Sequence, residues 1–227
     1  MAISRISTKE LDQISEVGCA LVSSCLDAPT LNEIGDLLDA GHAGVRNLLD
    51  IPAIRRLASS SAVRSPMAPV LGSNCFAVRG ILFNKVGEAN WKVAWYQDCV
   101  IAVAQQKEVP GWGPWSIKAG VHHVRPSSEL MSQMLAVRLH LDDCGNDNGP
   151  LRVVPDSHRQ GFLSDTQIQE WPKDNAVTTA SRGDAILTRP LLLHGSSAAK
   201  VPNSRRVLHL EFAADELPAG VNWRDRA

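Results

Sequence analysis

The chain has 227 residues, enough for a single domain with a sizeable hydrophobic core. Its 23 Lys and Arg nearly balance its 24 Asp and Glu, and the formal net charge is −1. No basic run marks a nucleic-acid surface or a polybasic membrane patch, so the composition favours a small-molecule substrate over nucleic acid or membrane.

The N-terminal residues lack the apolar segment of a secretion signal, and no stretch is apolar for long enough to span a bilayer. The five cysteines include no Cys-x-x-Cys pair. We therefore expect reduced, mostly buried thiols and a cytoplasmic location. The oligomeric state leaves no signal in the sequence.

The first part of the chain, residues 1–70, has apolar residues at helical spacing. Residues 7–10 (Ser-Thr-Lys-Glu) form a capping box, and the apolar positions through 22 continue the pattern. A second box spans 30–33, and 50–52 (Asp-Ile-Pro) is typical of a helix start with the aspartate as cap. We predict three helices here.

From about residue 71 the pattern changes to short apolar runs separated by Gly, Pro, Asn and Asp. This spacing predicts antiparallel strands in a sandwich or closed roll. Residues 104–130, rich in Gly, Pro, Trp and His, are predicted to be a long loop that acts as a lid. The candidate strands are residues 76–85, 94–103, 134–142, 150–154, 184–193 and 205–212.

Two residue pairs in this half of the chain are candidates for a metal site. Residues i and i+2 of a strand share a face, so a His-x-Asp pair and one distant histidine can hold a metal together. Such a ligand set is typical of non-haem Fe(II) oxygenases. One pair is His140 and Asp142. The other is Tyr96 and Asp98, with tyrosine at the histidine position, and His194 is the distal residue for either pair.

The sequence from residue 76 onward resembles the phytanoyl-CoA dioxygenase family of Fe(II)- and 2-oxoglutarate-dependent oxygenases. The ordered set of motifs is more specific than any one of them. The matching segments are ILFNK (81–85), WYQD (95–98), NGPLRVVPDSH (148–158), GDAILTRPLLLHGSS (183–197) and SRRVLHLEF (204–212).

The resemblance implies a mainly β fold with flanking helices, whose core is a double-stranded β-helix, a jelly-roll form. We expect one domain over residues 1–227. Its helical part would be 1–70, and its jelly-roll core would be 71–227 with 104–130 as a lid-like insertion.

The resemblance also implies residue roles. The family's first metal motif falls on Tyr96 and Asp98, and its distal metal histidine falls on His194. Arg205, eleven residues later, would bind the distal carboxylate of 2-oxoglutarate, because a guanidinium is a planar fork that matches a carboxylate. Ser196 would be a second contact to the same co-substrate.

Position in the chain favours the pair at 96 and 98 over the pair at 140 and 142. Only six residues separate Asp142 from Gly149 of the NGPL segment. In the resembled family, this makes 134–142 the strand that leads into NGPL rather than the metal strand. The pair at 140 and 142 stays an alternative. Arg138, on the same strand face, is predicted to point into the roll and to bind the co-substrate.

The implied reaction oxidises a small organic molecule, by hydroxylation or otherwise, with decarboxylation of 2-oxoglutarate to succinate. The sequence does not identify that molecule.

Tyr96 departs from the family's pattern, because a neutral phenol is a poor ligand and a phenolate favours Fe(III). Four interpretations stay open. Tyr96 is an unusual ligand, or stands beside a metal held by Asp98 and His194. It disables iron chemistry, leaving a small-molecule binding protein or a non-oxidative enzyme. It is a His→Tyr change in an ordinary oxygenase. It is a core aromatic, with the metal pair elsewhere.

Overall fold

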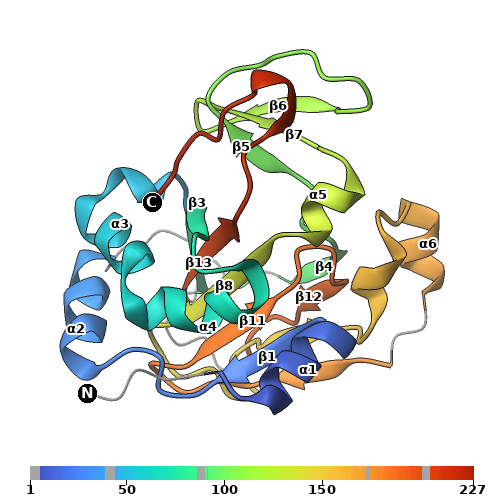
Figure 1. Cartoon of the computed structure of the whole chain (residues 1–227). Coiled ribbons are helices and arrows are strands. Elements are labelled where there is room, and N and C mark those ends of the chain that lie inside the picture. The colour runs from blue at the N-terminus through green and yellow to red at the C-terminus, as the bar shows by residue number, and fades with distance from the viewer. Residues whose placement is uncertain (1–5, 39–43, 86–89, 91, 172–173, 201–204) are drawn as a thin grey trace.

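The fold is built on antiparallel sheets that enclose a common interior, with helices packed outside (Figure 1). The computed structural model describes residues 6–38, 44–85, 90, 92–171, 174–200 and 205–227. Its helices are α1 (Thr8–Glu16), α2 (Ala28–Leu37), η1 (Leu48–Asp50), α3 (Pro52–Ser59), α4 (Ser61–Leu71), α5 (Ser128–Ser132), η3 (Ser157–Gln160), α6 (Asp165–Glu170) and η4 (Pro218–Gly220). Its strands are β1 (Cys19–Val22), β2 (Gly44–Val45), β3 (Phe76–Lys85), β4 (Val93–Tyr96), β5 (Ile101–Val103), β6 (Trp115–Lys118), β7 (Val121–Val124), β8 (Leu135–His140), β9 (Leu151–Val153), β10 (Ala176–Thr178), β11 (Ala185–Thr188), β12 (His194–Ser196) and β13 (Arg205–Ala213).

The two main sheets are antiparallel throughout. The larger has the strand order β1-β11-β8-β13-β3-β2, and the smaller has the order β10-β9-β12-β4. Apolar side chains from β1 and β11 of the larger sheet pack against those from β9 of the smaller sheet. This two-sheet arrangement is the predicted jelly-roll core.

The outer face of the larger sheet carries the main hydrophobic core. Alternate residues of β13, among them Leu208, Leu210 and Phe212, are fully buried in one cluster with residues of η1, α3 and α4. Because side chains alternate along a strand, the residues between them point to the opposite face, into the roll. The helices thus cover one face and leave the other free for a site.

The helix starts follow the expected chemistry in part. In the 7–10 capping box, Ser7 Oγ accepts from the backbone N–H of Glu10, whose carboxylate accepts from the N–H of Ser7. Pro52 lies in the first turn of α3, but the expected cap at Asp50 is wrong, because Ile51 holds the N-cap position and makes no side-chain cap. The box expected at 30–33 is wrong, because Asp27 caps α2 instead.

Residues 19–22 contradict the all-helical expectation for 1–70, because they form β1 and pair with β11 at an edge of the larger sheet. Gly18 redirects the chain at the end of α1, with a φ of +91°. A Cβ at this position would lie 2.6 Å from Nδ1 of His158, so a side chain there would have to displace the imidazole. A short apolar run does not by itself distinguish a helix from a strand.

The segment expected as a long loop at 104–130 instead contains β6 and β7. With β5 they form a separate sheet of order β5-β7-β6, which stands at the top of the molecule (Figure 1). We call this three-stranded sheet the lobe. The run 94–103, expected as one strand, is divided between β4 of the smaller sheet and β5 of this lobe. One hydrophobic cluster, including Phe76, Val124 and Trp223, joins the lobe to the body.

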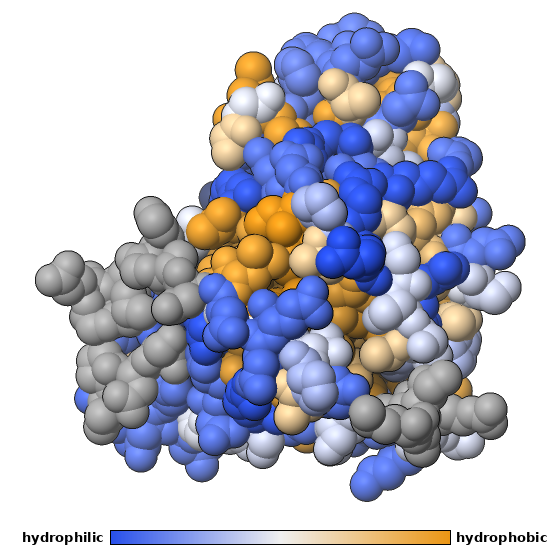
Figure 2. Space-filling view, turned by 90° about the vertical axis from the view of Figure 1, so that its left-hand side faces the viewer, coloured by the Kyte–Doolittle hydropathy of each residue, from blue (hydrophilic) through white to orange (hydrophobic). Residues whose placement is uncertain are grey.

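A side view shows one face of the molecule. Hydrophobic side chains gather between the lobe at the top and the body below, flanked by hydrophilic surface (Figure 2). The C-terminal segment also binds the lobe, since Ala104 N–H donates to Asn222 and Arg224 N–H donates to Ala102. Among the described helices, none is both long and apolar enough to cross a membrane.

Candidate active site

Strand register places charged side chains opposite one another on the inner face of the larger sheet. Side chains of directly opposed residues in antiparallel strands lie on the same face. Three such pairs join β13 to its neighbours, and each contributes at least one cation to the interior of the roll. The pairs are Lys85 with Arg205, Arg79 with Glu211, and Arg138 with His209.

The smaller sheet brings the predicted metal residues together. Tyr96 of β4 lies opposite His194 of β12, and their ring centroids are 4.3 Å apart with the planes at 54°. Asp98 follows two residues after the end of β4, and its Oδ2 lies 3.7 Å from Nε2 of His194. The pair at 96 and 98 therefore shares a site with His194, as expected from its position in the chain.

Gln97 fixes the backbone between Tyr96 and Asp98. Its side-chain amide donates to the carbonyls of Gly161 (2.9 Å) and Leu191 (2.7 Å), and its oxygen accepts from the N–H of Leu163 (2.8 Å). The backbone N–H of Asp98 donates to Pro190. Gln97 points away from the site, so the residues on either side of it point in.

The hydrogen bonds of His194 assign its tautomer. Nδ1 lies 2.7 Å from the carbonyl of Leu192 and donates its proton there, which leaves Nε2 with a lone pair. Nε2 is buried and has no hydrogen-bond partner in the described part of the chain. Burial lowers the pKa of His194, so the imidazole is neutral near pH 7. A neutral imidazole with its second nitrogen anchored is the form that binds a metal.

Asp98 complements this imidazole as an anion. Burial alone would raise the pKa of Asp98, but His194 and His209 when protonated, together with Arg79, outweigh burial and lower it. The ionised carboxylate of Asp98 and the unprotonated Nε2 of His194 are both acceptors, and no donor of the described residues lies between them. A cation bound by both would satisfy them. Asp98 and His194 therefore fit the demands of a metal site.

Tyr96 has different chemistry. Burial raises the pKa of its phenol, and the negative charge of Asp98 raises it further. The phenol therefore keeps its proton at neutral pH. A protonated phenol is a weak donor to a cation, so the structure gives Tyr96 the less favourable state for a metal ligand.

A cavity of about 150 Å³ opens beside the ring of His194. Three of its lining residues are cations, which suits an anionic ligand. Arg205, predicted as the co-substrate residue, is among them, as are Ser196 and Arg138. The lining residues are Phe83, Lys85, Val93, Tyr96, Arg138, Leu151, His194, Gly195, Ser196 and Arg205.

Arg205 is only partly satisfied by the protein. One guanidinium nitrogen donates to the carbonyl of Gly149 at 2.7 Å, while Nε is buried without a partner among the described residues. Burial lowers the pKa of Arg205, though the group stays charged. An unpartnered guanidinium N–H beside a cavity is suited to a carboxylate.

Lys85 is a cavity residue that the sequence analysis did not single out. Its ammonium donates to Ser196 Oγ at 2.9 Å and to the carbonyl of Ser197. Burial lowers its pKa to about 8, with a further contribution from Arg205. The ILFNK motif contained the residue, and only the strand register shows that it faces Arg205.

Gly149 allows the NGPL turn to come this close. Its φ is +60°, and a Cβ there would lie 2.7 Å from the carbonyl oxygen of Ser197 and 3.0 Å from Nζ of Lys85. A side chain at this position would displace the ammonium.

The alternative pair at 140 and 142 is separated by the structure. His140 is buried in the roll, where burial and the charge of Arg138 lower its pKa to about 3. Asp142 instead accepts three hydrogen bonds of 2.8–2.9 Å from the backbone and guanidinium of Arg206. The geometry thus groups His194 with residues 96 and 98.

Arg79 and Glu211, which the sequence analysis also left out, form a buried ion pair in the roll. His209 shares a strand face with Arg205 and lies beside them, with Nε2 3.2 Å from Glu211. Alternation along RRVLHLEF was the available signal for Glu211. Arg79 carried no signal, because its inward direction depends on pairing with β13.

Comparison with known proteins supports the resemblance drawn from the motifs. The family model described as phytanoyl-CoA dioxygenase (PhyH) matches residues 20–207. That match covers most of the chain and confirms the predicted family. No protein of curated function matches the sequence.

Several solved structures share the fold. Iron-bound HygX from Streptomyces hygroscopicus has a TM-score of 0.68 at 13% identity, over 98% of this chain and 97% of that one. EctD from S. alaskensis has a TM-score of 0.69 at 18% identity, over 94% and 82%. SnoN, a non-haem α-ketoglutarate-dependent epimerase of nogalamycin biosynthesis, has a TM-score of 0.64 at 17% identity, over 93% and 89%. The predicted double-stranded β-helix is confirmed.

Proposed function

Since the chain belongs to the phytanoyl-CoA dioxygenase family, we propose that it is an Fe(II)- and 2-oxoglutarate-dependent oxygenase that oxidises a small organic molecule. The observation that carries this proposal is the placement of an anion pocket beside a metal-ligand pair. The pocket contains Arg205, Lys85 and Ser196, and the ligand pair is Asp98 and His194.

Each residue has a role that follows from its contacts. Arg205 and Lys85 bind the distal carboxylate of 2-oxoglutarate. Both cations are buried, and Nε of Arg205 has no hydrogen-bond partner among the described residues, so an anion between them is favourable. Ser196 Oγ, held by Lys85, is the second polar contact. Asp98 and His194 would hold the metal. When bound, iron and 2-oxoglutarate supply the oxidising chemistry, and 2-oxoglutarate becomes succinate.

Known ligands of the similar structures support this assignment. HygX has been crystallised with nickel, 2-oxoglutarate and hygromycin B, and EctD with 2-oxoglutarate and 5-hydroxyectoine. SnoN has been crystallised with Fe³⁺, α-ketoglutarate and nogalamycin RO. Their differing substrates, and the epimerase activity of SnoN, leave the reaction of this chain defined only as an oxidation dependent on 2-oxoglutarate.

An anaerobic titration tests the proposal. Addition of Fe(II) and 2-oxoglutarate to the metal-free protein should give the visible charge-transfer band of a chelated iron–oxoglutarate pair, and admission of O₂ should release succinate. The Arg205→Met variant should need far more 2-oxoglutarate to reach the same colour. A protein that gives neither band nor succinate would instead be a small-molecule binding protein, the role that the neutral phenol of Tyr96 favours.

A further inference from the structure

β13 brings two further metal-ligating side chains to Asp98. A carboxylate oxygen of Asp98, a ring nitrogen of His209 and a carboxylate oxygen of Glu211 all lie within 4.8 Å of one another. His209 and Glu211 are each 2% exposed. We propose that Asp98, His209 and Glu211 hold the metal of this protein, with His194, which faces Asp98, as a further ligand, and that Tyr96 is not a ligand. This inference rests on the proposed function, and it assigns the metal ligands.

Unpartnered acceptor atoms point to a cation at this place. Oε2 of Glu211 and Nε2 of His194 are both buried without a hydrogen-bond partner among the described residues. Nε2 of His194 already faces Asp98 at 3.7 Å. Buried acceptors that lack a donor are costly, and coordination of a cation removes that cost.

The second oxygen of Glu211 is held in place from the other side. Oε1 accepts from Arg79, its partner in the β3–β13 register, and lies 3.2 Å from Nε2 of His209. Arg79 therefore orients the carboxylate while Oε2 stays available. Such support of a ligand by a second residue is a regular feature of metal sites.

His209 needs a tautomer change to bind a metal. Arg138 lies 3.5 Å from its Nδ1, and an arginine only donates, so Nε2 carries the ring proton in the metal-free protein. A metal ligated by Nε2 would require the ring proton at Nδ1, where Arg138 could no longer donate. The 3.5 Å contact with Arg138 is at the long limit of hydrogen bonding, and coordination would also replace the 3.2 Å contact of Nε2 with Oε1 of Glu211.

Tyr96 occupies a different place. Its ring packs against the ring of His194, with centroids 4.3 Å apart. The family's first ligand position is thus filled by an aromatic side chain that stacks on the distal histidine. Two ligands from β13, on the facing sheet, compensate for the histidine that is missing at position 96.

Metal affinity separates the two ligand sets. Co(II) is titrated into the metal-free full-length protein anaerobically, by calorimetry and by its visible absorption bands, with thermal melts to confirm folding. Glu211→Gln and His209→Gln should each weaken Co(II) binding tenfold or more, and Tyr96→Phe should stay within threefold of the parent. His209→Gln leaves the Arg79–Glu211 ion pair intact, so it remains informative if Glu211→Gln fails to fold.

A rescue experiment adds a second criterion. Combining Tyr96→His with Glu211→Gln restores the residue types of the two-histidine, one-carboxylate set at 96, 98 and 194, and should recover Co(II) affinity. Loss of affinity in Tyr96→Phe with full affinity in both β13 variants would overturn the proposal in favour of a tyrosine ligand. Unchanged affinity in all three single variants would also overturn it.

The proposed function is judged by a separate measurement. If the parent protein forms succinate but the β13 variants bind Co(II) normally, only the ligand assignment fails. If the β13 variants lose Co(II) but the parent shows neither 2-oxoglutarate binding nor succinate, the metal site stands and the oxygenase proposal fails.

Discussion

Lys85 of β3 and Arg205 of β13 lie directly opposite one another, and both line the same cavity. Two buried cations so close repel, and Arg205 is second only to burial in lowering the pKa of Lys85 to about 8. An anion bound between them relieves that repulsion. This relationship underlies the first two predictions.

Arg205→Met should weaken 2-oxoglutarate binding by about 30- to 100-fold, because a charge-assisted hydrogen bond is worth roughly 2–3 kcal/mol. The KM for 2-oxoglutarate, or its Kd by calorimetry, measures the effect. The matched control is Arg56→Met, which removes an exposed arginine whose ion pair with Glu33 spans 3.7 Å. Equal KM values for Arg205→Met and the control would contradict the carboxylate role.

The affinity for 2-oxoglutarate should fall as pH rises above 8. Below that pH, Lys85 is protonated, and its positive charge favours binding of the 2-oxoglutarate dianion. Above it, Lys85 must take up a proton for the ligand to bind, so the Kd rises by up to about tenfold per pH unit. Lys85→Met should bind more weakly at pH 7 and lose this dependence. Lys200→Met, which removes an exposed lysine paired with Asp147, should keep the parent profile.

Gln97→Glu should destabilise the protein by about 2 kcal/mol or more while keeping the shape of the side chain. The amide donates to two carbonyls, and an ionised carboxylate would face both of them as an acceptor. Urea unfolding measures the change. Because Gln97 lies between Tyr96 and Asp98, metal affinity should fall in the same variant, and an unchanged midpoint with unchanged affinity would refute the positioning role.

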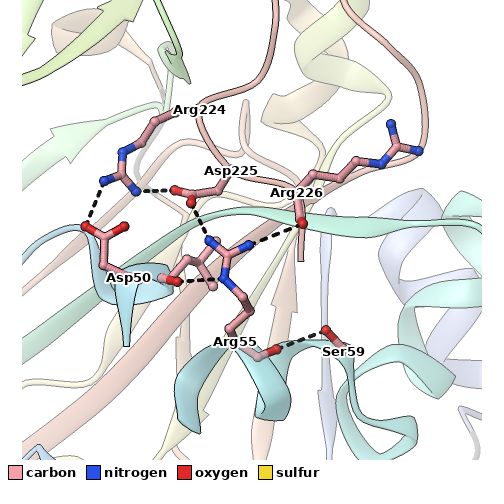
Figure 3. Close-up of polar contacts among 7 residues, drawn as sticks. Asp50, Arg55, Ser59, Arg224, Asp225 and Arg226 are labelled. Carbon is pink, nitrogen blue, oxygen red and sulfur yellow. Dashed lines mark hydrogen bonds and ion pairs between the residues drawn. The ribbon is translucent and has the colours of Figure 1, made fainter. Parts of the chain in front are cut away.

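Asp225→Asn should lower stability by about 1–3 kcal/mol. Asp225 is 8% exposed and accepts from both Arg55, at 2.7 Å, and Arg224, which also pairs with Asp50 (Figure 3). These contacts hold the C-terminal segment against η1 and α3. Ser59→Ala is the control, since it removes one exposed hydrogen bond in the same region. Thermal unfolding distinguishes the two, and equal melting temperatures would contradict the prediction.

Several features could be predicted from the sequence because they depend on local chemistry or on motif order. The capping box at 7–10 and the β3 strand at 76–85 follow from residues close in the chain. The motif order identified the family and brought residues 96, 98, 194 and 205 into one hypothesis. Their individual roles stay predictions, as do the cytoplasmic location and the absence of a nucleic-acid partner.

Other features needed the pairing of distant segments. The apolar run at 19–22 fits a helix or a strand equally well, and the open edge of β11 makes it a strand. The Gly- and Pro-rich composition of 104–130 predicts a loop. The hairpin in this segment forms because β5 pairs with it and the C-terminal segment supports β5. Neither partner can be predicted from the sequence of residues 104–130 alone.

The sequence by itself determined the family, the jelly-roll fold and the unusual tyrosine at position 96, because these depend on residue type and order. Only the tertiary structure decided which side chains meet at Asp98. The register between β3, β13 and β8 sets Arg79, Glu211 and His209 beside it, and a one-residue shift of β13 would turn Glu211 and His209 away. The ability of this chain to hold a metal without a histidine at 96 therefore depends on strand pairing.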